Sequence, residues 1–174
     1  MTGKYFDTQQ AAPPGVAGNI ANRLLPTPIV IFILDDQRYG LALSAVERVV
    51  RVVDVTPLPK APDIVSGVIN VQGRIIPVVN VRRRFRLAER EAALSDQLII
   101  ARTSRRSVAL VVDAVTGVLE CPEGETIPPD AIVPGLEYVA GVVKLSDGMV
   151  LIHDLDRFLS LDEERVLHEA MANA

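Results

Sequence analysis

The sequence predicts an all-β protein: two small five-stranded β-barrels packed together, followed by a short C-terminal helix. Three observations lead to this fold class. The chain is 49% hydrophobic and has no Trp, and its apolar residues are mainly Val, Ile, Leu and Ala, a composition that favours strands. Two-residue turns that contain Gly join neighbouring apolar runs. The same order of strands and Pro-rich loops occurs twice along the 174 residues, which indicates an internal repeat.

Five apolar runs of strand length form the first repeat unit. They are IVIFIL (29–34), RYGLAL (38–43), VERVVRVV (46–53), GVINV (67–71) and RIIPVVNV (74–81). A Pro-rich loop follows the third run and interrupts strand pairing. Gln72 and Gly73 separate the last two runs, and a two-residue turn with Gly predicts a hairpin. Pro77 interrupts the last run, so we expect an edge strand or a bulge at that position.

A charged, Ala-rich connector at 86–97 precedes five further apolar runs. These are LIIA (98–101), SVALVVD (107–113), VTGVLE (115–120), AGVVKL (140–145) and GMVLIHDL (148–155). A second Pro-rich loop again follows the third run. Ser146, Asp147 and Gly148 join the last two runs, and the Asp-Gly pair again predicts a hairpin turn.

Aligning the chain with itself supports the repeat. One alignment places Gly67 on Gly141, and a second, which suits the earlier part of each unit, places Leu41 on Leu110. Each unit is too short for a β-sandwich, so closure into a small barrel would hide its strand edges. Two such barrels, each marginal alone, would share an apolar surface between them.

The repeat and the ends of the chain define the expected domain organisation. The expected parts are a tail (1–27), a folded domain (28–160) with barrels at about 28–88 and about 95–158, and a terminal helix (161–174). An exchange of strands between the barrels is an open alternative. The tail contains Pro and small polar residues, so we expect disorder or ordering against a partner. The helix is predicted because Ser160 and Glu163 have the spacing of a capping box.

Charge and composition argue against several classes of protein. The formal net charge of −4 gives no general basic excess for a polyanion, so no nucleic-acid partner is expected. Cys121 is the only cysteine, which fits a reducing compartment. The N-terminus lacks the apolar segment of a secretory signal, and no run reaches the roughly 20 apolar residues that span a bilayer. We therefore expect a cytoplasmic protein with no direct membrane insertion.

Residues with catalytic chemistry do not form a recognisable motif. The best group of metal-ligand residue types is His153, Asp154 and Asp156, but neighbouring strand residues point to opposite faces. We interpret this group as a strand end that runs into a solvated turn. Nucleophile, zinc and phosphate-loop motifs are absent from the sequence. We expect no catalytic residue, no metal and no cofactor, and an enzyme is the weakest hypothesis.

An arginine run offers an alternative function. Arg82, Arg83, Arg84 and Arg86 lie together with Phe85, and proteins that bind single-stranded nucleic acid combine such charge with stacking aromatic residues. Aromatic residues make up only 4% of the chain, so we interpret the run as the solvated end of a strand or short helix. A small-barrel nucleic-acid-binding protein remains the rival hypothesis.

The stretch GVINVQGRIIPVVNVRRRF at 67–85 resembles a family signature. The CheW-like coupling domain of bacterial chemosensory systems has the loose pattern G-V-x-N-L-R-G-x-I-x-P-V-x-D-L-R-x-x-F. YGLALSAVERVV (39–50) and VALVVDAVTGVL (108–119) resemble its flanking stretches, and the similarity covers about 28–160. The signature positions considered further are Asn70, Gln72, Gly73, Pro77, Asn80 and Arg82.

This resemblance implies two SH3-like barrels and a scaffold without enzymatic activity. Members of the family bridge the cytoplasmic tips of methyl-accepting chemoreceptors and the regulatory domain of a CheA-type histidine kinase, in a two-component chemotaxis system. The implied partners are that kinase domain and a receptor signalling tip, with recruitment to membrane-associated receptor arrays. An adaptor for a non-flagellar pathway that controls pili, surface motility or gene expression is the alternative.

The resemblance also places a receptor helix in the groove between the barrels. The implied contact positions are Leu43, Val46, Glu47, Arg48, Gly67 and Leu98. An apolar groove that accepts an amphipathic helix is an established mode of recognition. Gly67 would allow close approach of a partner backbone. A bulge that needs special backbone angles explains the same glycine equally well.

Three residues depart from the family pattern. Gln72 replaces Arg, Asn80 replaces Asp, and Arg48 stands where Glu is frequent. If Arg48 and Gln72 lie close together, the pair avoids two facing cations at a partly buried site. We expect these departures to affect the choice of partner rather than the fold.

Overall fold

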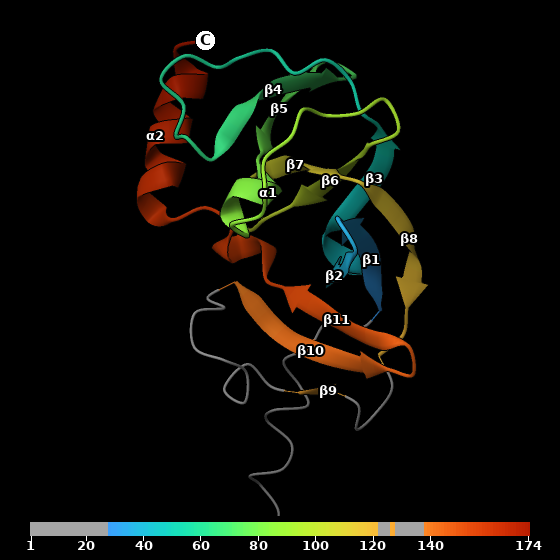
Figure 1. Ribbon diagram of the computed structural model, residues 1–174. Helices are drawn as coiled ribbons and strands as arrows, with labels where there is room; N and C mark the ends of the chain where they lie inside the picture. The colour runs from blue at the N-terminus through green and yellow to red at the C-terminus, as the bar shows by residue number, and fades with distance from the viewer. Residues whose placement is uncertain (1–27, 122–125, 128–137) are drawn as a thin grey trace, which may run out of the picture.

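The computed structural model describes residues 28–121, 126–127 and 138–174. Within these ranges the chain forms two β-sheets and a C-terminal helix (Figure 1), which confirms the predicted all-β fold class. The predicted tail at 1–27 and most of the second Pro-rich loop lie outside the described residues. None of the described helices is long and apolar enough to cross a membrane.

The described strands form a six-stranded and a five-stranded sheet. In spatial order, the six-stranded sheet contains β8 (Ala114–Leu119), β1 (Ile29–Leu34), β2 (Gln37–Ala42), β11 (Gly148–His153), β10 (Val139–Leu145) and β9 (Thr126–Ile127). The five-stranded sheet contains β3 (Val46–Arg51), β6 (Gln97–Arg102), β7 (Ser107–Val112), β5 (Arg74–Val79) and β4 (Val65–Val71). The helical segments are η2 (Leu43–Ala45), α1 (Val81–Arg84), η4 (Leu155–Arg157) and α2 (Leu161–Ala172).

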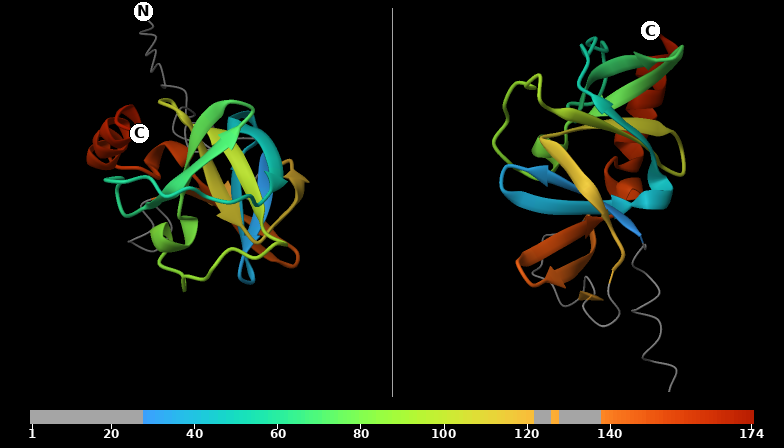
Figure 2. Two further views of the ribbon diagram at one scale, coloured as in Figure 1. Left: turned by 90° about the horizontal axis from the view of Figure 1, so that it is seen from above. Right: turned by 90° about the vertical axis from the view of Figure 1, so that its right-hand side faces the viewer.

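Each sheet combines strands from both halves of the chain. The hairpin of β1 and β2 lies beside β11 and β8 from the second half, and the hairpin of β6 and β7 lies beside β5 and β3 from the first half. Neither sheet therefore corresponds to one of the continuous ranges 28–88 and 95–158. Figures 1 and 2 show the two sheets above one another, with α2 along one side of the five-stranded sheet.

The strand registers confirm the internal repeat. In the hairpin of β4 and β5, Val65 pairs with Val79 and Gly67 with Val78, which leaves a bulge between the two pairs. The alignment of Gly67 with Gly141 maps these pairs onto those of β10 and β11, including the bulge. The second alignment likewise maps the register of β1 and β2 onto that of β6 and β7. The two sheets are thus related by the repeat, with one hairpin of each unit exchanged.

Neither sheet closes into a complete barrel among the described strands, which corrects the expectation of two closed barrels. The five-stranded sheet comes close to closure through one bridge, in which Thr56 N donates to Val68 O at 2.9 Å and Val68 N donates to Thr56 O at 2.8 Å. Pro57 follows directly and has no N–H to extend this pairing. In the other sheet, β9 occupies the corresponding place beside β10.

Pro77 does not lie on an edge strand, because β5 is between β7 and β4. The parallel ladder between β5 and β7 contains only Val78 and Val79 of β5. Pro77 therefore lies just outside this ladder, where its missing N–H is tolerated. The bulge of β4 lies opposite the next two residues.

Three apolar clusters make up the core. The largest includes Phe32, Leu110, Phe158 and Leu167, so it joins both sheets and α2. A second cluster, which contains Ile76, belongs to the five-stranded sheet, and a third belongs to the six-stranded sheet. The shared cluster makes the sheets one packed body.

The predicted capping box starts α2. The hydroxyl of Ser160 accepts a hydrogen bond from Glu163 N at 3.2 Å, and the carboxylate of Glu163 accepts one from Ser160 N at 2.7 Å. Leu167 and Ala170 on the same helix are buried against the shared core. The helix is therefore fixed by both a local and a tertiary interaction.

Gly67 has a structural role in the five-stranded sheet. Its φ is +152°, and a Cβ atom built on it would lie 2.2 Å from Thr56 O. The glycine therefore lets the segment around Thr56 pair with β4, as the bulge explanation of this residue requires. Gly117 in β8 has nearly the same φ, +151°, but a Cβ there would have no neighbour within 4 Å.

We predict that Gly67→Ala lowers the free energy of unfolding by about 2 kcal/mol more than Gly117→Ala. Both substitutions add the same backbone strain, but only Gly67→Ala forces a side chain into the backbone of Thr56. Urea unfolding of the two variants measures the difference. Equal losses would show that the contact with Thr56 is not what requires glycine.

Candidate partner-binding surface

The stretch from η2 through β3 contains four of the six expected contact positions. β3 pairs with β6 through a bulge, since Val46 lies opposite Ala101 and Arg48 opposite Ile100. The bulge leaves Glu47 as the extra residue, and such an insertion turns a side chain away from the regular alternation. Leu43 is 37% exposed, Val46 is half-buried and Arg48 is exposed.

Glu47 bonds to the sheet behind it. Its carboxylate accepts hydrogen bonds from Ser107 Oγ at 2.6 Å, Arg74 Nη1 at 3.0 Å and Arg102 Nε at 3.3 Å. The bonds from Arg74 and Ser107 lower the pKa of Glu47 to about 2. The carboxylate is therefore ionised at neutral pH and orders the start of β5 and β7.

The other two expected positions do not present a side chain at this surface. Leu98 on β6 is 0% exposed and packs in the core cluster of the five-stranded sheet. The direction that a side chain at Gly67 would take is filled by Thr56. Val49 was not among the expected contact positions, yet it is 36% exposed on β3. The bulge explains this exposure. It adds one residue to β3, so the residues after it face the opposite side of the sheet from the side that regular alternation would give them.

Arg48 and Gln72 meet across the surface, with Arg48 Nη1 donating to Gln72 Oε1 at 3.4 Å. Gln72 and Gly73 have φ of 53° and 85°, as in the type I′ turn that favours tight hairpins. Asn70 Oδ1 accepts a hydrogen bond from Gly73 N at 2.8 Å and fixes this turn. Three of the signature residues therefore set the position of the turn beside Arg48.

Asn80 caps α1. Its side-chain oxygen accepts a hydrogen bond from Arg83 N at 2.9 Å. Asn and Asp are both strong N-cap residues, so the departure from Asp keeps the cap. Among the three departures, this one has no consequence for the local structure.

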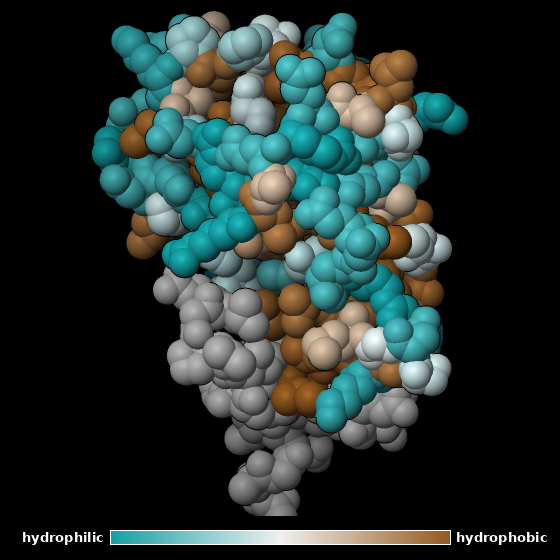
Figure 3. Space-filling model, viewed as in Figure 1, coloured by the Kyte–Doolittle hydropathy of each residue, from teal (hydrophilic) through white to brown (hydrophobic). Residues whose placement is uncertain are grey.

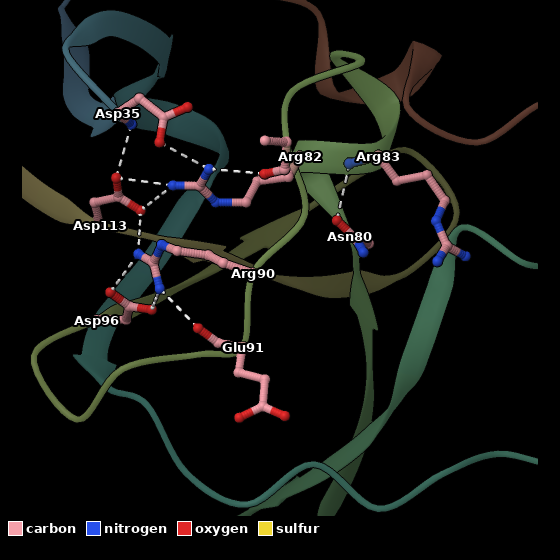
Figure 4. Close-up of polar contacts among 9 residues, drawn as sticks. Asp35, Asn80, Arg82, Arg83, Arg90, Glu91, Asp96 and Asp113 are labelled. Carbon is pink, nitrogen blue, oxygen red and sulfur yellow. Dashed lines mark hydrogen bonds and ion pairs between the residues drawn. The ribbon is translucent and has the colours of Figure 1, made fainter.

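Arg82 is a buried link between the two sheets (Figure 4). Its Nη1 donates to Asp35 in the turn between β1 and β2 at 2.9 Å, and its Nη2 donates to Asp113 at the junction of β7 and β8 at 2.7 Å. The side chain of Arg82 is only 9% exposed. Because Asp35 follows a strand of one sheet and Asp113 a strand of the other, the guanidinium joins them.

Further hydrogen bonds complete this link. Asp35 N donates to Asp113 Oδ2 at 2.7 Å, and Arg90 Nη2 donates to the other oxygen of Asp113 at 2.6 Å. Arg90 also forms two 2.8 Å bonds with the buried carboxylate of Asp96. Burial opposes the ionisation of Asp113, but the bonds from Arg82, Asp35 and Arg90 lower its pKa overall. We call Arg82, Asp35, Asp113, Arg90 and Asp96 the inter-sheet cluster.

Arg83 and Arg84 of the arginine run also form ion pairs within the chain. Arg83 pairs with Glu89 at 2.5 Å, and Arg84 Nη2 pairs with Glu163 of α2 at 2.7 Å. These pairs offset much of the positive charge that suggested a nucleic-acid site. Figure 3 shows the resulting polar band over α1 and the loop that follows it, above an apolar area at the hairpin of β10 and β11.

The suggested metal-ligand residues do not converge. His153 is buried and stacks on Phe85, with 4.2 Å between ring centroids. Asp154 accepts a hydrogen bond from Asp156 N at 3.0 Å, and Asp156 accepts one from Ser104 N at 2.6 Å. Within the described residues, no group of three or more His, Cys, Asp or Glu is arranged to hold a metal ion.

The fold and this surface are those of an interaction domain, and comparison with known proteins identifies the family. Residues 28–163 match the CheW-like domain, so the chain belongs to the CheW-like domain family. Chemotaxis protein CheW of Thermotoga maritima is 31% identical over 140 residues, which cover 80% of this chain and 92% of the relative. Protein FrzA of Myxococcus xanthus is 29% identical over 129 residues, which cover 72% of this chain and 79% of the relative.

A solved structure supports the same assignment. The crystal structure of scaffolding protein TtCheW from Thermoanaerobacter tengcongensis matches with a TM-score of 0.72 and 31% sequence identity. The match covers 80% of this chain and 96% of that chain. The SH3-like character predicted for the fold is therefore shown, although the described sheets are open.

We predict that Arg82→Met lowers the free energy of unfolding by about 3 kcal/mol, because it removes from a buried position the guanidinium that pairs with both Asp35 and Asp113. Arg83→Met is the matched control: it removes an exposed ion pair one residue along and should cost less than about 1 kcal/mol. Denaturant unfolding followed by circular dichroism measures both. Similar small losses would contradict the role assigned to the inter-sheet cluster.

Proposed function

We propose that this protein is a non-catalytic adaptor of a bacterial chemosensory array, which couples chemoreceptor tips to a CheA-type histidine kinase. The observation that supports this function most directly is the family match over 28–163, which includes both sheets and the start of α2. Relatives named chemotaxis protein CheW and a neighbour described as a scaffolding protein agree with it. An adaptor needs surfaces for two partners, and the repeat supplies related features in both sheets.

The receptor tip binds the stretch from η2 through β3. Leu43 and Val49 supply exposed apolar area there, and Arg48 supplies an exposed positive charge. An amphipathic helix recognises such a surface by burying its apolar face, while a charged contact sets its orientation. Glu47 acts behind this surface, since its carboxylate is already bonded to three neighbours. Leu98 and Gly67 support the surface from the core.

The kinase domain binds at the outer end of the hairpin of β10 and β11, because the equivalent end of the hairpin of β4 and β5 contacts β3 through Gln72 and Arg74. Ile75 lies just after the turn of one hairpin and is 51% exposed, and Met149 lies at the equivalent position of the other hairpin and is 52% exposed. Large apolar residues exposed at the same position of both repeat units are candidates for contacts with another protein. The two partners would then bind at the same time.

We predict that the purified chain binds a receptor-tip peptide bundle and the kinase regulatory domain simultaneously, each with about micromolar affinity, near −8 kcal/mol. Arg48→Glu should weaken only the binding of the receptor tip from the same organism, whereas Met149→Glu should weaken kinase binding alone. Arg105→Glu reverses an exposed charge in the loop between β6 and β7 and serves as the control. Calorimetric titration measures each affinity, and mutual competition between the two partners would rule out separate surfaces.

A dedicated, non-flagellar pathway is a second candidate because of one contact. The hydrogen bond between Arg48 and Gln72 occupies positions where the family pattern has Glu and Arg. The hydrogen bond keeps the two side chains together as an ion pair would. At position 48, however, the surface has the cation of Arg48 in place of a carboxylate. A receptor tip with a cation that pairs with Glu would face the like charge of Arg48 here. This repulsion selects against binding of such a receptor.

We predict that Gln72→Arg alone lowers the free energy of unfolding by up to about 1 kcal/mol, because it places a second guanidinium beside Arg48 at an exposed site. Adding Arg48→Glu should restore the loss and improve binding to receptor tips of a general chemotaxis system. A double-mutant cycle on unfolding and on receptor affinity measures the coupling. Effects that add within about 0.5 kcal/mol would mean that the two positions act independently.

A further inference from the structure

A cavity on the side away from β3 has features that the adaptor function does not use. Its volume is about 500 Å³, and it lies between α1, the first turn of α2 and the hairpin of β10 and β11. This volume is in the range of small-molecule sites. The residues that the argument uses are Tyr39, Arg84, Phe85, Tyr138, His153 and Glu163.

Flat side chains form much of the wall. Phe85 stacks on His153 with 4.2 Å between ring centroids and 22° between ring planes, and Tyr39 stacks on Phe85 at 5.0 Å. The guanidinium carbon of Arg84 lies 5.2 Å from the centre of the Tyr138 ring. Such walls favour a planar ligand over a branched aliphatic one.

Two side chains in this wall contain buried polar atoms without a partner. His153 is 5% exposed, and among the described residues neither of its ring nitrogens forms a hydrogen bond of good geometry, although the Tyr138 backbone is near enough to raise its pKa slightly. Arg84 donates from Nη1 to Tyr138 and from Nη2 to Glu163, but its Nε has no partner in the same part of the chain. Buried polar groups are almost always satisfied, because an unpaired one destabilises the fold.

The repeat shows that the fold does not require polar residues at these positions. The alignment that places β4 and β5 on β10 and β11 maps Val79 onto His153, since Val65 pairs with Val79 as Val139 pairs with His153. The same alignment maps Arg84 onto Phe158, which is 1% exposed. The first unit thus has the buried Val79 where the second has the imidazole of His153. The second unit has the buried Phe158 where the first has the guanidinium of Arg84.

A third position follows the same pattern. Ile64 maps onto Tyr138: Asn80 N donates to Ile64 O at 2.8 Å, and Asp154 N donates to Tyr138 O at 2.9 Å. Ile64 is buried, whereas Tyr138 has a hydroxyl that accepts from Arg84. The three exceptions to the apolar pattern, Arg84, Tyr138 and His153, all line one cavity.

We infer that this cavity binds a small aromatic carboxylate, with its ring along Phe85 and Tyr138 and its carboxylate accepting from Arg84 Nε and from His153. Arg83 and Arg84 are paired with Glu89 and Glu163, so the cavity wall has little net charge, and the donors without a partner on Arg84 and His153 are what favour a carboxylate. Burial lowers the pKa of His153 to about 4, against a smaller opposing effect of the Tyr138 backbone. The imidazole is therefore neutral at pH 7 and has one N–H to donate.

The test uses the full chain and two pairs of probes. Because the chain has no Trp, indole fluorescence reports only the probe. Indole-3-acetate is titrated against tryptophol, which has the same ring system and no carboxylate, and benzoate is compared with benzyl alcohol by NMR. We expect saturable binding of at least one carboxylate with a Kd below about 1 mM, and at least tenfold weaker binding of its alcohol.

Two variants locate the site. His153→Val installs the residue that the other repeat unit has, so the protein should melt at the same or a higher temperature and bind the carboxylate at least tenfold more weakly. Arg84→Lys retains the charge that pairs with Glu163 but removes the Nε donor, and should also weaken binding. Arg105→Met removes an exposed charge outside the cavity and should change nothing. If His153→Val does not fold, Arg84→Lys decides the test.

Several outcomes would overturn the inference. One is the absence of saturable binding by both carboxylates, and another is equal binding by the wild type and both cavity variants. Equal affinity for carboxylate and alcohol would contradict the role given to Arg84 and His153. If neither carboxylate binds but His153→Val weakens binding of the kinase domain or the receptor tip, the cavity is a protein contact and the small-molecule inference is wrong.

Discussion

The guanidinium of Arg82 is the interaction on which the arrangement of the two sheets depends. It lies between Asp35, in the turn of the hairpin formed by β1 and β2, and Asp113, which directly follows β7 of the other sheet. That hairpin belongs by sequence to the first repeat unit but pairs with strands of the second. Because the hairpins are exchanged, neither sheet can form from one half of the chain alone. Apolar packing has no preferred direction, so the shared core alone does not select this exchange. The charge-assisted hydrogen bonds of the inter-sheet cluster are directional and fix it.

The exchange has a consequence for an adaptor. Each sheet contains strands of both units, and the largest apolar cluster joins both sheets and α2. The two sheets therefore move as one body, and a partner bound to one sheet is held in place relative to the other sheet. The surface at β3 and the hairpin end at Met149 are therefore held in a constant relation. A scaffold that sets the spacing between a receptor and a kinase needs this rigidity more than it needs a catalytic group. The cavity beside α1 lies in the same rigid body, at positions where one unit has a polar residue and the other an apolar one.

Local signals in the sequence predicted the strands, the hairpin turns, the capping box and the repeat, because each depends on residues close together in the chain. The partners of the hairpins could not be predicted, since both arrangements bury the same apolar faces. The burial of Arg82 was missed because its neighbours are also basic, and only the distant Asp35 and Asp113 distinguish it from a surface arginine. Leu98 was expected at the surface but lies in a central strand. His153 was interpreted as a strand end, and nothing in the sequence near it indicates that Arg84 and Tyr138 lie in the same cavity.

Receptor control of kinase activity tests the adaptor function most directly. Membranes that contain a chemoreceptor and the CheA-type kinase of the same organism would be assayed for kinase autophosphorylation, with and without this chain, as the attractant concentration is varied. An adaptor that couples the two proteins predicts that attractant controls the kinase only when the chain is added, and that Arg48→Glu removes this control while the kinase alone is unaffected. Full attractant control in the absence of the chain, or none in its presence, would contradict the function proposed for it.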